Sequence, residues 1–146
     1  MTREEDAVKY FVDGLSCAPA VFAAFGKEMG LTEDDCLKIG CAFGGGMARH
    51  QYTCGAVTGA LMALGLYFGR GAGDGPEKKE LTYEKTNEFM EEFTRLHGSL
   101  NCRELLQGLN MNAPGDKKKI EEQQLFKTLC PKYVRDAAEI VEKLIH

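Results

Sequence analysis

The sequence predicts an all-α fold, a compact bundle of helices around a central apolar helix that is rich in Gly and Ala. Apolar residues recur at helical spacing in nearly every segment, and the alternation of apolar and polar residues that marks a strand is absent. Residues 54–68 are apolar nearly all round, which is typical of a helix at the centre of a bundle. No internal repeat or low-complexity tract is present, so we expect residues 1–146 to form a single domain.

Three helices are predicted before the central one. Residues 4–13 carry apolar side chains at helical spacing. Ser16 is a preferred cap for a second helix, which Gly30 ends. Residues 32–35 resemble a capping box with Asp in place of the usual Glu and begin a third helix, which the glycines at 44–46 break.

Small residues lie four apart along the central helix, which Thr53 is expected to cap. Gly55 and Gly59 are at this spacing, as are Ala56 and Ala60. A glycine inside a helix costs roughly 1 kcal/mol relative to Ala, so close packing is the reason we infer for these residues. We therefore expect Gly59 to contact another backbone or a bulky side chain.

The C-terminal half adds further helices after a glycine-rich loop at 69–76. Residues 81–97 form an amphipathic pattern that ends at Gly98, and 118–129 are weakly helical. Asn101 is expected to cap a short helix over 102–108, and Pro131 begins the terminal helix. The side chains predicted to point inward from residues 81–97 are Phe89, Met90, Phe93 and Leu96.

Four of the six cysteines are predicted to lie in the first turn of four different helices. Each stands beside a residue type that begins helices: Ser, Thr or Asn before it, or Pro after it. The unpaired backbone N–H groups and the positive end of the helix dipole favour a thiolate there. A thiolate is the nucleophile of thiol–disulfide exchange and a ligand for iron–sulfur clusters and zinc. We predict that these cysteines converge on one site, as redox thiols or as metal ligands: Cys17, Cys54, Cys102 and Cys130.

Cys54 is predicted to be the most reactive thiol, because it begins the central helix and has Arg49 and His50 nearby to supply positive charge. Cys36 and Cys41 lie within a helix without a cap residue beside them, and we expect both to be buried packing residues. No Cys-x-x-Cys is present, so the thioredoxin motif and the common zinc ribbon are excluded.

The glycines near Cys54 are the candidate contacts to a cofactor. Gly45 and Gly46 could present backbone N–H groups to a phosphate, although no Lys-Ser or Lys-Thr pair follows them. A tight turn that brings the chain close to the start of the central helix is the interpretation we favour. Gly55 leaves room beside Cys54 for a ligand, a cluster or a second sulfur.

Charge and hydropathy narrow the classes of partner. The net charge is −4 and no dense basic stripe is present, which argues against nucleic acid. The N-terminus is polar and acidic, and the most apolar stretch is shorter than the roughly 20 residues that a membrane span needs. We therefore expect a cytoplasmic protein with no membrane span. In that reducing compartment, six cysteines indicate metal binding or catalysis rather than structural disulfides.

The run of three glycines at 44–46, followed by Cys54-Gly55-Ala56-Val57-Thr58-Gly59, resembles a bacterial and archaeal family of small redox-active proteins. That family, C_GCAxxG_C_C, is recognised by four cysteines and a Cys-Gly-Ala-x-x-Gly motif. The resemblance covers most of the chain and assigns the same four cysteines, while Cys36 and Cys41 fall outside the pattern. Domains similar to this family occur beside electron-transfer modules. The resemblance therefore implies a redox function, with an iron–sulfur cluster as the candidate cofactor.

The leading hypothesis is a redox protein that uses the four cysteines either as ligands of an iron–sulfur cluster or another metal, or as exchanging thiols. One alternative is a metal-binding or sensing module without electron transfer, and another is a helical interaction domain with incidental cysteines. The redox partner is not identified by the sequence. The oligomeric state is also left open, and a homodimer is one of the options.

Overall fold

The computed structural model describes residues 1–146 and confirms the all-α prediction. Apart from an isolated antiparallel bridge between Thr53 and Asn101, all regular structure is helical. None of the helices has the length and apolar character needed to cross a membrane. The elements are α1 (Arg3–Val12), α2 (Cys17–Gly26), α3 (Glu33–Gly40), the 3₁₀ turn η1 (Cys41–Phe43), α4 (Gly44–Met47), α5 (Gly55–Phe68), α6 (Glu77–His97), α7 (Cys102–Leu105), α8 (Pro114–Glu122), α9 (Leu125–Thr128) and α10 (Cys130–Ile145).

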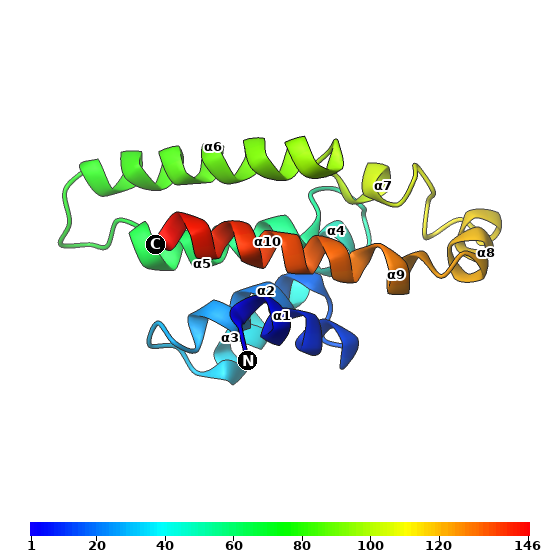
Figure 1. Ribbon diagram of the computed structural model, residues 1–146, viewed down its shortest axis with the longest axis horizontal. Helices are drawn as coiled ribbons and strands as arrows, with labels where there is room; N and C mark the ends of the chain where they lie inside the picture. Colours follow the sequence, from blue (N-terminus) through cyan, green and yellow to red (C-terminus); the bar gives the residue numbers. More distant parts are fainter.

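The longer helices lie in three layers (Figure 1). The helix α6 forms one outer layer, α5 and α10 form the middle layer, and α1, α2 and α3 form the other outer layer. Both middle helices begin at the end of the molecule where α4, α7, α8 and α9 gather, whereas the loop between α5 and α6 lies at the opposite end. The starts of several helices therefore lie close together at one end.

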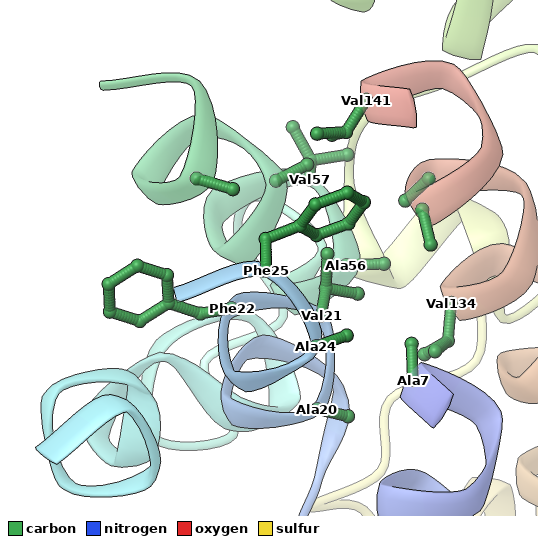
Figure 2. Close-up of a cluster of buried hydrophobic side chains, with 14 of the residues drawn as sticks. Ala7, Ala20, Val21, Phe22, Ala24, Phe25, Ala56, Val57, Val134 and Val141 are labelled. Atoms are coloured by element: carbon green, nitrogen blue, oxygen red, sulfur yellow. The ribbon is translucent and has the colours of Figure 1, made fainter. Parts of the chain in front are cut away.

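The core fixes α2, α5 and α10 against one another. Nine of the ten residues of α2 are buried, and Figure 2 shows Phe25 of this helix lying between α5 and α10, near Val57 and Val141. The central helix α5 packs on α2, α6 and α10, and its partner α2 is buried even more completely. These three helices carry or adjoin three of the four cysteines selected from the sequence.

The close packing predicted for Gly59 is confirmed. A Cβ atom built on Gly59 would lie 2.5 Å from the carbonyl oxygen of Ala18 and 3.1 Å from its Cα. Real Cβ atoms essentially never come so close to backbone, so only glycine allows α5 to approach the start of α2 at this distance.

Several predicted boundaries differ from the structure. The helix α6 begins at Glu77 rather than residue 81, and although Phe89 and Phe93 are buried as predicted, Leu96 is 44% exposed. The short helix α7 ends at Leu105. The weakly helical region at 118–129 is two helices, which are separated at Gln124, where the backbone adopts a left-handed φ of 54°.

Candidate functional site

Four helix starts meet around one cavity of about 550 Å³. The cysteines are the first residues of α2, α7 and α10 and the N-cap residue of α5, so each lies at a helix start as predicted. All four side chains line the cavity: Cys17, Cys54, Cys102 and Cys130. Residues that are far apart in the sequence thus contribute to one site.

The capping residues that led to this prediction do not cap. The side chain of Ser16 makes no capping hydrogen bond, and the backbone there has a φ of 38°. Thr53 and Asn101 instead form the bridge that joins the segments before α5 and α7. Across these segments Cys54 N donates to Leu100 O at 2.8 Å. Backbone pairing, rather than side-chain capping, therefore places these two helix starts side by side.

The glycine-rich segment is the tight turn favoured from the sequence. Residues 45–49 all have left-handed φ values, between 50° and 71°, which costs non-glycine residues roughly 1–2 kcal/mol each. The turn directs the N–H of Gly45 to the sulfur of Cys17. A Cβ on Gly46 would lie 2.8 Å from the Cβ of Cys102. The strain is therefore concentrated where the chain wraps around two of the cysteines, and a direct contact of these glycines with a cofactor stays a prediction.

Because Gly55 has no side chain, the sulfur of Cys17 can lie directly beside it. A Cβ on Gly55 would lie 2.5 Å from the Sγ of Cys17 and 3.0 Å from the backbone nitrogen of Ala18. The residue after Cys54 thus has to be small for the sulfur from α2 to approach α5. In the structure, the room predicted beside Cys54 is filled by a second sulfur.

The thiols of Cys17 and Cys54 share a hydrogen bond and differ strongly in acidity. That bond, together with N–H groups of Gly45, Cys17 and Ala18, outweighs burial and lowers the pKa of Cys17 to about 6. The pKa of Cys54 is raised well above its usual value, because its thiol donates to Cys17 and because it is buried. This order of pKa values runs against the prediction that Cys54 is the most reactive thiol and favours Cys17 as the thiolate.

The helix-start effect does not reach Cys102. Burial raises the pKa of Cys102 to about 12, and the charge on Cys17 contributes. The amide of Cys102 donates to the Tyr52 carbonyl at 2.6 Å, and that of Arg103 donates to Gln51 O at 3.2 Å. Those two backbone donors are already engaged, so they do not stabilise a thiolate, and the four-residue α7 adds little dipole.

Cys130 is likewise held as a thiol. The pKa of Cys130 is raised to about 12, mainly by burial and to a smaller extent by the charges on Cys17 and Cys102. Pro131 has no N–H to offer the sulfur, and the amide of Tyr133 donates to the Leu129 carbonyl at 3.2 Å. A position at a helix start thus lowers the pKa only where backbone donors are left for the sulfur.

The other two cysteines differ from each other. Cys36 is fully buried, as predicted, and packs against Gly26. Cys41 is exposed and lines the cavity, so the prediction of burial is wrong for it. The reason is that α3 ends at Gly40, which places Cys41 in a 3₁₀ turn at the surface rather than on the inner face of a helix.

Only one of the two residues expected to supply positive charge near Cys54 lies at the cavity. Arg49 lines the cavity, whereas His50 does not and stacks on Tyr52 with ring centroids 5.6 Å apart. Neither residue contributes to the shift in the pKa of Cys54. His97, another histidine near a cysteine in the sequence, lies with its Nε2 2.9 Å from a carboxylate oxygen of Asp136.

Gln51 is an organising residue that the sequence did not reveal. Its side chain is buried, donates to Leu109 O at 2.8 Å and accepts from the amide of Met111 at 2.8 Å. These bonds tie the loop after α7 to the segment before α5. A lone Gln between two loops gives no local signal of such a role.

Four cysteines are the ligand set that iron–sulfur clusters commonly take, but no three His, Cys, Asp or Glu side chains are placed to hold a metal ion. The arrangement therefore does not fit a preformed ion site, whereas it does form a closely interacting thiol pair at Cys17 and Cys54.

Residues 15–144 match the family described as "Putative redox-active protein (C_GCAxxG_C_C)". The chain belongs to this family. The matched region includes the four cysteines at helix starts and begins after α1. An uncharacterized protein of Archaeoglobus fulgidus is 26% identical over 114 residues, which cover 73% of this chain and 76% of that protein. No solved structure matches the chain.

Proposed function

We propose that this member of the redox-active family works by thiol–disulfide exchange, with Cys17 as the attacking thiol and Cys54 as the resolving thiol. The observation that supports the proposal is the asymmetry of the pair. A hydrogen bond joins the two sulfurs, and the pKa of Cys17 is lowered to about 6 while that of Cys54 is raised. Exchange needs a thiolate to attack and a second thiol to release the product.

The chemistry balances with these two residues. The Cys17 thiolate attacks one sulfur of a disulfide R–S–S–R, forms a mixed disulfide and releases RS⁻. RS⁻ takes the proton of Cys54, whose thiolate then attacks the Cys17 sulfur and displaces the second R group as a thiolate, which is protonated by solvent. The protein gains a Cys17–Cys54 disulfide, and the substrate is reduced to two thiols.

A cofactor-based function is the second candidate, because four cysteines from four helix starts line one cavity. All-cysteine ligation is the usual way in which proteins hold iron–sulfur clusters, and it also occurs at zinc sites. In that case Cys17, Cys54, Cys102 and Cys130 would be the ligands, and the glycines of the turn would lie beside the bound group.

The organisation of the chain as a single domain and its location in the cytoplasm also remain predictions.

The test is peptide mapping of the full chain, purified and reduced without air and then treated with a limiting amount of a small disulfide. We expect a Cys17–Cys54 disulfide. Cys54→Ser should trap the mixed disulfide on Cys17, and Cys17→Ser should slow the reaction strongly. Cys41→Ser is the matched control, since it removes an exposed thiol that lines the same cavity.

Absorption spectra and metal analysis of the same anaerobic preparation separate the candidates. Iron–sulfur bands that disappear in Cys102→Ser and Cys130→Ser would favour the cluster. A colourless protein whose first oxidised product links other cysteines would contradict both the exchange mechanism and the role of Cys17.

A further inference from the structure

The cavity is larger than a pair of reacting sulfurs needs. Its volume of about 550 Å³ falls in the range of roughly 300–1,000 Å³ that is typical of sites for small organic molecules. Besides five cysteines, seven of the seventeen residues that line it are hydrophobic, among them Leu105, Met111 and Phe126. Such walls suit a molecule with an apolar body rather than a bare inorganic ion.

One positively charged side chain, that of Arg49, lines this cavity. Arg49 is the only Asp, Glu, Lys, Arg or His among the lining residues. Its guanidinium takes part in none of the ion pairs or side-chain hydrogen bonds of the structure. A planar guanidinium without a carboxylate partner is suited to bind a carboxylate or phosphate from a ligand.

The stem of Arg49 lies against the turn that contacts Cys17. A Cβ on Gly45 would lie 3.0 Å from the Cγ of Arg49, so the stem of the arginine covers this glycine. The N–H of the same glycine donates to the sulfur of Cys17. The turn that carries Arg49 therefore also contacts the attacking sulfur, which belongs to α2. Because a thiolate repels anions, an anionic substrate needs a cation of this kind close to the point of attack.

We propose that the cavity binds a small organic disulfide with an apolar body and an anionic group, that Arg49 binds this anionic group, and that Cys17 attacks the disulfide. The proposal rests on thiol–disulfide exchange by Cys17 and Cys54 and adds the class of substrate. The bonds formed and broken are those of the exchange reaction, in which the substrate disulfide is reduced to two thiols and the protein is oxidised.

The test compares two aromatic disulfides: dithiobis(nitrobenzoate), which carries carboxylates, and dithiodipyridine, which is neutral near pH 7. Rates of thiol release are measured on the reduced native chain, on Arg49→Gln and on Arg70→Gln. Arg70→Gln is the matched control, because this substitution removes the same charge from the exposed loop between α5 and α6, at the opposite end of the molecule (Figure 1).

With the native chain, the rate for the anionic disulfide should level off as its concentration rises. Arg49→Gln should reduce the ratio of the anionic to the neutral rate constant by about tenfold, as expected for the loss of one charge-assisted hydrogen bond. Arg70→Gln should leave this ratio unchanged. The ratio cancels any general effect of the lost charge on the Cys17 thiolate, which would slow both probes.

An unchanged ratio in Arg49→Gln, with both probes still producing the Cys17–Cys54 disulfide, would overturn the substrate class and leave the exchange function standing. The same holds if the rate rises linearly with no sign of a bound complex. If neither probe produces that disulfide, both the exchange function and the substrate class are wrong.

Discussion

The thiolate at Cys17 depends on its neighbour Cys54, and replacing that neighbour by Ala measures the dependence. With a pKa of about 6, Cys17 is roughly 90% ionised at pH 7. The largest cause of the lowered pKa is the hydrogen bond from Cys54, and the backbone N–H groups of Gly45 and Ala18 contribute less. In Cys54→Ala the pKa of Cys17 should therefore rise towards its ordinary value of 9.0.

The rate at a single pH is a poor measure of this change. If the pKa rose all the way to its ordinary value, the ionised fraction at pH 7 would fall to about 1%. A more basic thiolate is also a better nucleophile, with a Brønsted coefficient of about 0.4–0.5, so each thiolate would react roughly 20-fold faster. The two effects nearly cancel, and the rate of alkylation at pH 7 would fall only about fivefold.

The midpoint of the pH profile is the decisive quantity. Alkylation by iodoacetamide, followed for Cys17 by mass spectrometry across a range of pH, gives this midpoint directly. Cys54→Ser keeps an O–H donor and should retain most of the lowered pKa, while Cys41→Ser should change nothing. A midpoint that stays near the native value in Cys54→Ala would mean that backbone donors alone hold the thiolate, and our account of the pair would be refuted.

Three further predictions test the packing, the buried thiols and the loop contact. Gly59→Ala should destabilise the protein by about 1–3 kcal/mol, because its Cβ would meet backbone, whereas Gly65→Ala has open space and should stabilise it by up to ~1 kcal/mol; equal urea midpoints would contradict this. Folding raises the pKa of Cys102 and Cys130 to about 12, so their contribution to stability is complete below about pH 8.5 and is lost as the pH rises towards 12. Replacing both by Ser should therefore flatten the alkaline decline in melting temperature. An unaltered decline would contradict this prediction. Gln51→Ala removes two hydrogen bonds and should cost about 1–3 kcal/mol, with faster amide exchange at 109–111, and unaltered exchange there would disprove the contact.

The sequence predicted where the four cysteines lie but not why they lie there. Helix periodicity and cap residues located the helix starts, and each cysteine is at one. The side chains of Ser16, Thr53 and Asn101, however, make no capping hydrogen bond, and a backbone bridge positions the last two instead. Such a bridge joins segments that are far apart in the sequence, so no local pattern can reveal it.

The same limit explains why the order of the pKa values differs from the one expected from the sequence. A helix start lowers the pKa of a cysteine only if its backbone donors are left for the sulfur. At Cys102 the first amide donates to Tyr52 O, whereas at Cys17 three N–H groups reach the sulfur. The positions of Cys41 and Gln51 were hidden for a related reason, since exposure and side-chain contacts in loops follow from the tertiary fold.

The Cys-Gly-Ala-x-x-Gly motif can now be explained by packing between two helices. Both of its glycines are in contact with the start of α2: Gly55 at the sulfur of Cys17, and Gly59 at the backbone of Ala18. A Cβ at either position would push the two helix starts apart and so separate the sulfurs of Cys17 and Cys54. The motif therefore specifies the cysteine of its own helix together with the distance at which a cysteine from another helix can approach it. A hydrogen bond between two sulfurs requires such an approach, and on that bond the thiolate depends.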